Sequence, residues 1–391
     1  MHRIKICVVT GSRAEFGYLL PLLHRLNEDA FFELKLVVTG AHLSERHGFT
    51  VKEIEDSGIP IDAKIPVLGI ENNSREGIAL QIGEIIKSFT SYFSTNRPDL
   101  LIAIADRYEI FSVGIAASTL LIPICHISGG STTSGAIDEI YRHSLTKMSE
   151  IHFPTCEEYR KRVIQLGENP NHVYNAGSLA IENCLKTNLY SRIDLLNELI
   201  MDINKPYCVV TYHPVTLELG ESEDSVYELI HAFDMNPQYQ YLITLSNADS
   251  GGDNINNIWI TESKKRKNFY VFQSLGMKRY LTALKYAKMM IGNSSSGTTE
   301  GPAMRIPVIN IGDRQKGRVF PSCALHCQAQ RDEIDACIKK AQSEEYLEFV
   351  KKTDNPFGDG DTSRKMIEIL KKEINNGINI KKNFFDIDYK V

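Results

Sequence analysis

The fold is indicated most clearly by the stretch Ala287-Lys288-Met289-Met290-Ile291-Gly292-Asn293-Ser294-Ser295-Ser296-Gly297-Thr298-Thr299-Glu300, in which a mostly apolar run gives way to small polar residues. The run 287–291 predicts a buried strand, and a helix is expected to be under way by Gly301-Pro302-Ala303. A strand that enters a helix through a glycine-containing turn is typical of parallel α/β sheets. This stretch therefore predicts one repeat of a doubly wound sheet.

The polar half of the same stretch has the composition of an anion-binding loop. Small residues let the backbone approach a ligand, and a helix N-terminus offers unpaired N–H groups and a partial positive charge. Ser294, Ser295 and Ser296 add hydroxyl donors, which favours a diphosphate ligand. Glu300, in the first turns of the helix, is expected to accept hydrogen bonds from a ribose. The alternative is a serine-rich helix cap that binds no ligand.

Length and composition limit the class of protein. The chain has 391 residues, which suits two domains, and its 42% hydrophobic and 24% charged residues are typical of soluble globular proteins. A net charge of −5 without a basic tract argues against a nucleic-acid partner. The N-terminal stretch 3–9 is too short for a signal peptide, and no apolar run is long enough to cross a membrane, so no membrane partner is expected.

Cysteine usage indicates a reducing compartment. The eight cysteines are widely scattered, which predicts free thiols and a cytoplasmic location. Cys323 and Cys327 form the only close pair. Tetrahedral zinc requires four ligands, and because no second cluster is visible in the sequence, no metal site is expected.

The first half of the chain alternates apolar strands with amphipathic helices. Such alternation predicts a parallel, doubly wound sheet with right-handed crossovers. We expect strands at 4–10, 34–39, 100–105, 123–127, 151–154 and 173–175, and helices at 18–26, 78–93, 110–120 and from 136–139 through 147.

The pattern restarts after a helix near 179–186 and a more polar stretch, 187–205. Strands are expected at 207–212, 241–245, 269–272, 288–291 and 308–311, and a last helix at 362–375. We therefore predict an α/β protein with two Rossmann-like domains, residues 1–177 and 178–361. The C-terminal part, 362–391, is expected to rejoin the first domain, with 378–391 as a surface arm.

Polar residues follow the strands at the ends where parallel sheets bind ligands. Two sheets that face each other with such edges form a cleft between domains, as in nucleotide-sugar enzymes of the GT-B type. One fold hosts many functions, so architecture alone does not identify the reaction. The residues at these ends are Arg13, Asp106-Arg107, Ser128–Ser131, His213, Asn247, Ser294-Ser295 and Arg314.

Carboxylates at such an edge are candidates for proton transfer. Asp106 follows an aliphatic strand, and Asp138 and Glu139 open a helix after a glycine-rich loop. A carboxyl group in a cleft can have a raised pKa and act as an acid or base, although the same positions also suit a helix cap or first turn. His213 precedes Pro214, which keeps the backbone extended, and it either contacts phosphate, transfers protons or is a buried, hydrogen-bonded histidine.

The remaining candidates are basic residues and histidines. Arg314 and Arg318 lie in the loop 312–318, which either neutralises a leaving diphosphate or is a solvated basic loop. His126 and His143 are expected to be core or supporting residues. From the residues alone, the chain is a two-domain protein that binds an anionic nucleotide ligand near carboxylates.

At this point several motifs together resemble the hydrolysing UDP-N-acetylglucosamine 2-epimerases, in the right order and across nearly the whole chain. The likeness is greatest to the enzymes of bacterial sialic-acid capsule synthesis. It implies a UDP-sugar bound between the domains, no metal or NAD cofactor, and a homo-oligomer, either a dimer or a tetramer. The motifs are Gly11-Ser12-Arg13-Ala14-Glu15, Asp106-Arg107-Tyr108-Glu109-Ile110-Phe111-Ser112-Val113, Arg142-His143-Ser144-Leu145-Thr146-Lys147-Met148-Ser149, Gly292-Asn293-Ser294-Ser295-Ser296-Gly297 and Asn310-Ile311-Gly312-Asp313-Arg314-Gln315-Lys316-Gly317-Arg318.

The resemblance also implies a reaction. A base removes the C2 proton while UDP leaves C1, giving a 2-acetamidoglucal; water then adds at C1, and C2 is reprotonated from the opposite face to give N-acetylmannosamine. Matching positions make Asp106 and Asp138, with Glu139 beside it, the acid/base candidates, and His213 a supporting catalytic or phosphate contact. The implied UDP-sugar contacts are Arg13, Gly17, Arg107, Asn247, Ser294, Ser295, Ser296, Glu300 and Arg314.

One loop departs from the family pattern. The family has His-Ile-(Glu or His)-Gly-Gly-Glu where this chain has His126-Ile127-Ser128-Gly129-Gly130-Ser131, and Ala105 replaces a glycine before Asp106. Three alternatives therefore stay open. Besides the hydrolysing UDP-N-acetylglucosamine 2-epimerase, these are a hydrolysing 2-epimerase of UDP-2,4-diacetamido-2,4,6-trideoxyglucose in legionaminic acid synthesis, a non-hydrolysing epimerase and an inactive UDP-sugar-binding module.

Overall fold

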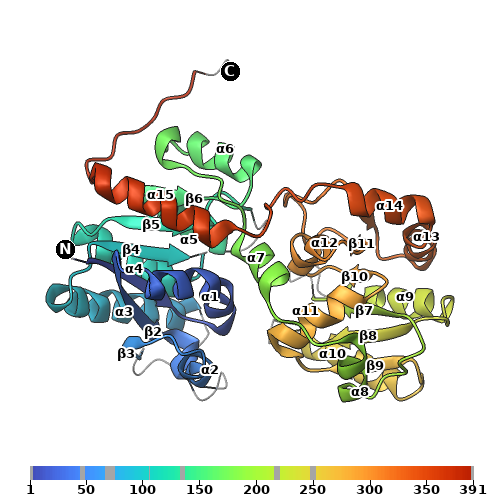
Figure 1. The fold of residues 1–391 in the computed structure, drawn as a ribbon. Coiled ribbons are helices and arrows are strands. Elements are labelled where there is room, and N and C mark those ends of the chain that lie inside the picture. Colours follow the sequence, from blue (N-terminus) through green and yellow to red (C-terminus); the bar gives the residue numbers. More distant parts are fainter. Residues whose placement is uncertain are drawn as a thin grey trace. The chain divides into compact units, whose positions relative to one another are not determined.

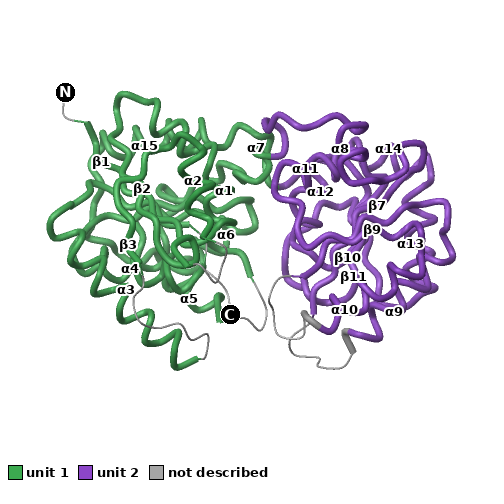
Figure 2. The backbone as a smooth tube through the Cα atoms, turned by 90° about the horizontal axis from the view of Figure 1, so that it is seen from below, with its two compact units in different colours: residues 1–132, 136–183, 357–391 green, residues 133–135, 184–356 purple. Residues whose placement is uncertain are grey.

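The computed structural model describes residues 3–44, 49–66, 75–104, 106–132, 137–214, 221–246 and 252–388. The chain divides into two compact units (Figure 2). Unit 1 comprises residues 1–132, 136–183 and 357–391, and unit 2 comprises residues 133–135 and 184–356. The boundary after residue 183 lies inside helix α7 (Leu179–Lys186), whereas the sequence placed it after 177.

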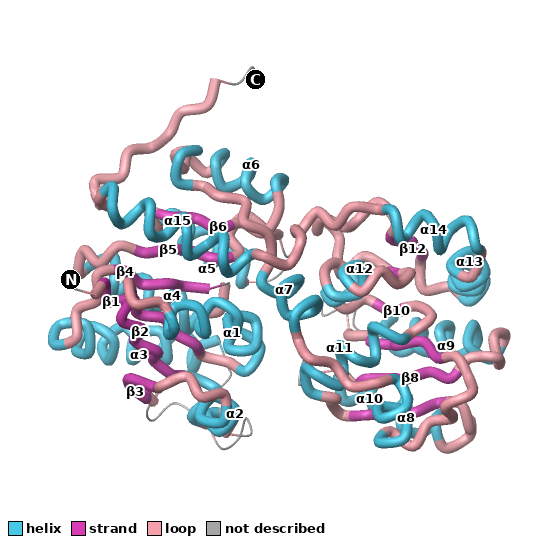
Figure 3. The backbone as a smooth tube through the Cα atoms, viewed as in Figure 1, coloured by secondary structure: helices cyan, strands magenta, loops and turns pink. Residues whose placement is uncertain are grey.

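Unit 1 is built on a six-stranded parallel sheet in the order β3-β2-β1-β4-β5-β6 (Figure 3). Ile6 and Val8 of β1 lie in one apolar cluster, and Cys7 and Val9 in another, all almost fully buried. Because both faces are covered, such a strand is a continuous apolar run in the sequence. The strands are β1 (Ile4–Thr10), β2 (Phe32–Thr39), β3 (Ile61–Ile65), β4 (Leu100–Ile104), β5 (Ile124–Ile127) and β6 (Ile151–Phe153).

Helices of unit 1 cover both faces of this sheet (Figure 1). The helix α15 comes from the far end of the chain and packs beside α1, where Arg25 Nε donates to Ser363 Oγ at 2.6 Å and Lys371 Nζ lies 2.6 Å from Asp29 Oδ2. Besides α7, the helices are α1 (Arg13–Glu28), α2 (Val51–Asp56), α3 (Arg75–Thr95), α4 (Tyr108–Thr119), α5 (Asp138–Met148), α6 (Glu157–Gln165) and α15 (Thr362–Asn376), with single turns η1 (Gly40–Leu43) and η3 (Pro170–His172).

Unit 2 repeats the architecture with the order β12-β11-β10-β7-β8-β9, again all parallel. Its strands are β7 (Tyr207–Thr211), β8 (Gln240–Thr244), β9 (Phe269–Phe272), β10 (Met290–Gly292), β11 (Val308–Ile311) and β12 (Ala324–Cys327). Its helices are α8 (Arg192–Glu198), α9 (Glu221–Asp234), α10 (Gly252–Ser263), α11 (Gly276–Tyr286), α12 (Glu300–Ala303), α13 (Arg331–Ala341) and α14 (Glu344–Lys352), with the turn η4 (Ser295–Gly297).

The two parallel sheets with flanking helices confirm the predicted fold class of two Rossmann-like, doubly wound units. Strands β3 and β12 were not predicted, because both lie at sheet edges, are only partly buried and lack a continuous apolar run. The strand predicted at 173–175 is wrong. Only an isolated bridge joins Val173 to His152, since Asn175 already turns the chain by accepting a hydrogen bond from Gly177 N at 3.2 Å. Within the described ranges, every helix is too short or too polar to cross a membrane.

Candidate active site

Each sheet contains a switch point, at which the strand order reverses its direction. It lies between β1 and β4 in unit 1 and between β7 and β10 in unit 2. In open α/β sheets, ligands bind beyond the carboxyl ends of the strands at such points. The residues that follow these four strands are Gly11-Ser12, Asp106-Arg107, His213 and Asn293-Ser294. Most of the predicted site residues therefore lie at or next to a switch point.

Arg142 on α5 joins two of the predicted acids in unit 1. It donates to Asp106 Oδ2 from Nε, at 3.1 Å, and from Nη2, and its Nη1 donates to Glu139 Oε2 at 2.7 Å and to the Ser131 carbonyl at 2.8 Å. Its side chain is only 1% exposed, and a buried guanidinium is stable only with such partners. Asp106 and Glu139 remain 27% and 29% exposed, so both carboxylates are held in place yet accessible.

Asp138, the first residue of α5, lies in the electrostatic field of this cluster. Burial raises the pKa of its carboxyl, and the charge of Asp106 raises that pKa further, whereas Arg107 and Arg142 lower it. Two neighbouring carboxyl groups, one ion-paired and one that holds its proton more readily, are the combination that acid/base catalysis requires.

A second pair of acids lies behind Arg107. The Glu109 side chain, 2% exposed, accepts hydrogen bonds from Arg107 Nη2 at 2.8 Å and Nε at 3.0 Å. Glu15 completes the cap of α1 by accepting from the backbone N–H groups of Gly11, at 2.7 Å, and Ser12, at 3.1 Å. Burial, together with the charge of Glu109, raises the pKa of Glu15 to about 8. Arg107, predicted to contact UDP, is thus held in place by the buried carboxylate of Glu109.

The loop that departs from the family pattern is strained. Ser128 has a φ of +68°, a conformation that residues other than glycine rarely adopt and that often marks functional sites. Its hydroxyl lies 3.4 Å from Tyr18 Oη, which in turn lies 2.8 Å from Ser178 Oγ. Ser131 contributes its carbonyl to Arg142. The loop therefore shapes the site, although its serines supply no carboxyl group.

Two histidines contact the side chains of α5. His126 is fully buried, with Nδ1 3.1 Å from Thr146 Oγ1, and His143 Nε2 lies 3.1 Å from Glu139 Oε1. His143 thus touches the same carboxylate as Arg142. Both histidines support α5 and its acids, which is the role the sequence suggested.

Asn293 organises the switch point of unit 2. Its buried side chain accepts from His213 N at 2.7 Å and donates to the His213 carbonyl at 2.8 Å, while its own carbonyl accepts from Arg314 Nη1 at 3.2 Å. Gly292 has a φ of +138°, and a Cβ there would overlap the Thr211 carbonyl oxygen, so β10 can end this close to β7 only with glycine. One asparagine therefore holds the segments that carry His213 and Arg314.

The helix predicted at Gly301-Pro302-Ala303 is present, but it is short. The chain forms the short turn η4 and then α12, which has only four residues. It ends there because Arg305 adopts a left-handed φ of +55° before the chain enters β11. A single helical turn carries little macrodipole, so an anion at this turn would depend on hydroxyl and backbone N–H donors.

The three serines of the turn are not equivalent. Ser294 is 9% exposed and accepts a hydrogen bond from Ser296 N at 3.3 Å, and Ser296 is hydrogen-bonded through its side chain to Tyr280. Ser295 is exposed. Glu300 accepts a hydrogen bond from Thr299 Oγ1. Ser295 is therefore the hydroxyl that the turn presents to solvent.

A cavity of about 360 Å³ lies at the carboxyl ends of β11 and β12. Its lining includes Arg318, His326, Phe320 and Lys316. Arg318 is one of the two arginines considered for a leaving diphosphate, whereas Ser295 and Arg314 are not among the lining residues. The cavity therefore shares the loop 312–318 with the predicted site.

Two of the other predicted contacts, Arg13 and Gly17, lie on α1. The Arg13 side chain is 54% exposed, with Nη1 3.9 Å from Glu53 Oε1, and the Gly17 carbonyl accepts from Asn183 Nδ2 at 2.8 Å. Among the described residues, the partner of Arg13 is thus Glu53 and not the acids near Arg142. Asn247 lies outside the described residues.

Sequence reasoning missed Arg142, Asn293, Glu15 and Glu109 as site residues. For Arg142 a signal existed: it follows Glu139 by three positions on one helix, a spacing at which side chains meet. The function of Asn293 depends on β10 lying beside β7, which no local pattern shows.

All eight cysteines belong to the described part of the chain and are free thiols. Within that same part, no group of three or more His, Cys, Asp or Glu residues is arranged to hold a metal ion. Cys327 is hydrogen-bonded to Cys337, and neither belongs to such a group within the described ranges.

Comparison with known proteins identifies the family. A family model described as UDP-N-acetylglucosamine 2-epimerase matches residues 24–371. The GDP/UDP-N,N'-diacetylbacillosamine 2-epimerase (hydrolyzing) of Campylobacter jejuni is 36% identical over 388 residues, 99% of this chain and 100% of that protein. The polysialic acid biosynthesis protein P7 of Escherichia coli is 39% identical over 385 residues, 98% of this chain and 97% of that protein.

A solved structure shows the same fold. The UDP-GlcNAc 2-epimerase of Neisseria meningitidis, crystallised with UDP-GlcNAc, superposes with a TM-score of 0.80 at 18% identity, covering 94% of this chain and 100% of that one. The fold, the residues at the switch points and the family match together lead to one conclusion: the chain belongs to the UDP-N-acetylglucosamine 2-epimerase family and is an enzyme, a hydrolysing UDP-sugar 2-epimerase.

Proposed function

We propose that the enzyme converts UDP-N-acetylglucosamine and water to UDP and N-acetylmannosamine, and that this product serves sialic acid synthesis. The family description names this substrate, and the Escherichia coli relative is named for polysialic acid biosynthesis. The observation that carries the proposal is the pair Asp106 and Glu139 bridged by Arg142, with Asp138 and its raised pKa beside it. Inversion at C2 removes a proton from one face and returns one to the other, which takes two groups.

We assign the first proton transfer to Asp106 and the second to Asp138. Asp106, in its ion pair, accepts the C2 proton; the C2–H electrons form the C1–C2 double bond, and the bond from C1 to the diphosphate oxygen breaks. Asp138 then gives its proton to the opposite face of C2 while water supplies hydroxyl to C1. The remaining water proton restores Asp138, and Asp106 loses its proton to solvent.

The UDP half of the substrate is assigned to unit 2. His213 and Arg314, both held by Asn293, and the exposed Ser295 offer donors to a diphosphate. Donors fixed before the reaction stabilise the negative charge that grows as UDP leaves. Arg107, held by Glu109 in unit 1, is assigned to the same leaving group.

The second candidate substrate is UDP-2,4-diacetamido-2,4,6-trideoxyglucose, on the route to legionaminic acid. The Campylobacter jejuni relative is named for a diacetylbacillosamine nucleotide. The observation at the site that favours a different sugar is the strained loop with Ser128 and Ser131, which stand where the family often has acids.

Incubation with each UDP-sugar in deuterium oxide, read by mass spectrometry, tests both candidates. The proposal expects free UDP and a 2-epimer that carries solvent deuterium at C2, with UDP-N-acetylglucosamine as the faster substrate. Release of UDP from the diacetamido sugar alone would transfer the assignment to the second candidate. A product that still carries UDP would contradict hydrolysis, and thermal stabilisation by UDP without any turnover would indicate an inactive module.

Asp106→Asn is the matched variant. It should abolish UDP release from the substrate, because the amide cannot accept the C2 proton, while UDP still raises the melting temperature. Unchanged turnover in this variant would refute the assignment of the base.

A further inference from the structure

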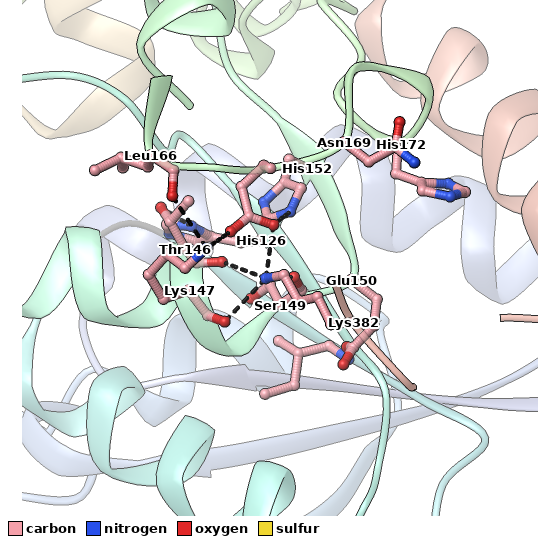
Figure 4. A network of polar contacts seen from close by, with 12 residues as sticks. His126, Thr146, Lys147, Ser149, Glu150, His152, Leu166, Asn169, His172 and Lys382 are labelled. Atoms are coloured by element: carbon pink, nitrogen blue, oxygen red, sulfur yellow. Dashed lines mark hydrogen bonds and ion pairs between the residues drawn. The ribbon is translucent and has the colours of Figure 1, made fainter. Parts of the chain in front are cut away.

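The chain beyond α15 returns to the catalytic helix of unit 1. We call residues 378–388 the C-terminal strap. Lys382 Nζ donates to three backbone carbonyls at the end of α5: Thr146 at 3.3 Å, Lys147 at 2.9 Å and Ser149 at 2.5 Å (Figure 4). The last carbonyls of a helix lack partners within the helix and carry its partial negative charge. Lys382 therefore caps α5 from a distant part of the sequence.

A buried carboxylate balances the charge of this cap. Glu168, 1% exposed, lies 2.6 Å from Lys382 Nζ and 2.6 Å from Lys147 Nζ, and its Oε2 lies 3.0 Å from His152 Nε2. Burial alone would raise the pKa of Glu168, but His152 and the two lysines lower it to about 2. Lys382 is itself largely buried, at 22% exposure. A buried ion network of this kind is costly to break because each remaining charge loses its partner.

The strap contacts Gly167 through two neighbouring phenylalanines, one by its backbone N–H and one by its ring. Phe385 N donates to the Gly167 carbonyl at 2.9 Å, and the Phe384 ring lies 5.1 Å from Lys147 Nζ. A Cβ at Gly167, whose φ is +86°, would overlap the Phe384 ring. The strap thus fits a surface that only glycine leaves open.

The cap is one helical turn from the acid cluster. Thr146, whose carbonyl accepts from Lys382, donates through Oγ1 to the Arg142 carbonyl at 3.0 Å and lies 3.1 Å from His126 Nδ1 on β5. Arg142 in turn holds Asp106 and Glu139. A shift of the last turn of α5 would therefore move the guanidinium that positions two carboxylates.

We propose that Lys382 is a positioning residue for the epimerase reaction: by capping α5 it sets the place of Arg142 and the acids. This inference rests on the proposed function for its kinetic consequences, whereas its structural consequence, the order of the end of α5, is independent of the substrate. Misplacement of catalytic groups by about 1 Å can cost on the order of a hundredfold in rate.

The test compares Lys382→Met, Lys382→Arg and Lys381→Met in the full chain. Lys381 is the matched control, because it is the neighbouring lysine and its side chain is exposed. Lys382→Met should lower kcat about tenfold or more with KM changed by less than about twofold, since most of the UDP contacts are assigned to unit 2 and Arg107 is held by Glu109. Lys382→Arg, which keeps the cation, should recover most of the loss, and Lys381→Met should behave as wild type.

Hydrogen exchange provides the readout that does not need activity. Amides of residues 145–149 should exchange faster in Lys382→Met, because the uncapped last turn frays, and should be unchanged in Lys381→Met. If Lys382→Met fails to fold, Phe384→Ala removes the ring over Gly167 but keeps the cation, and a smaller change in the same direction is expected.

A folded variant with wild-type kcat and wild-type exchange in α5 would overturn the inference. A second result would also overturn it: activity falls only in proportion to the loss of folded protein, and Lys382→Arg does not recover it. That result would show that Lys382 serves stability alone. Wild-type protein that is inactive on every UDP-sugar would instead contradict the proposed function, and exchange at the end of α5 would then decide the positioning claim alone.

Discussion

Replacement of Arg142 by methionine should damage both stability and catalysis. The change removes the hydrogen bonds that this side chain, 1% exposed, makes to Asp106, Glu139 and the Ser131 carbonyl, and it takes the paired cation away from two carboxylates. Loss of one partner from a fully buried ion pair costs about 3–5 kcal/mol. Because Asp106 and Glu139 are each more than a quarter exposed, water compensates part of this loss, and we expect a decrease of about 2–3 kcal/mol in the free energy of unfolding.

The kinetic effect of the same change should be larger. Without the guanidinium, Asp106 is free to rotate away from C2, so we expect kcat to fall on the order of a hundredfold. Because Arg142 lowers the pKa of Asp138, its removal should raise that pKa. The alkaline limb of the pH profile, which reflects the protonated Asp138 as general acid, should therefore move to higher pH. Urea denaturation gives the stability, and UDP release across a pH series gives the rate.

The control is Arg364→Met, which removes another arginine with two carboxylate partners, Asp361 and Glu368, on the surface of α15. Exposed ion pairs contribute little, so this variant should match wild type in both assays. The reasoning is refuted if Arg142→Met unfolds at the wild-type urea concentration and releases UDP at the wild-type rate. Loss of stability without loss of kcat per folded molecule would refute the catalytic half alone.

Three further changes test the switch points. Glu15→Gln should flatten the pH dependence of stability. The pKa of Glu15 in the folded state, about 8, lies above the ordinary value of 4.5, so the wild type loses stability as pH rises between these values. Urea titrations at pH 5 and pH 8 should show a smaller loss in the variant. Gly292→Ala should lower the free energy of unfolding by more than about 3 kcal/mol, because its Cβ would overlap the Thr211 carbonyl oxygen. The control Gly83→Ala lies in an open position on α3 and should raise the melting temperature, because alanine favours the helix by about 0.5–1 kcal/mol. Asn293→Ala should reduce the rise in melting temperature that UDP produces, and an unchanged rise would remove Asn293 from the proposed UDP site.

The fold was largely predictable because burial on both faces of a sheet leaves a local signature. Strands such as β1 and β7 are continuous apolar runs, and their alternation with helices permits few topologies. The edge strands β3 and β12 were missed for the complementary reason. Their residues are mostly half-buried or exposed and include polar side chains, so their sequences resemble those of loops, whereas the edge strands β6 and β9 are mostly apolar and were predicted.

For the site, the sequence by itself determined which residue types follow each strand: Asp106 after β4, His213 after β7 and Ser294 after β10. It determined this because strand ends and glycine turns are local features. Only the tertiary structure decided which of these residues act together, by bringing Arg142 to Asp106 across 36 positions, Asn293 to His213 across 80, and Lys382 to the end of α5 across more than 230. Strand order and helix packing set those contacts, and both depend on the free energy of the whole folded unit, which no local stretch encodes.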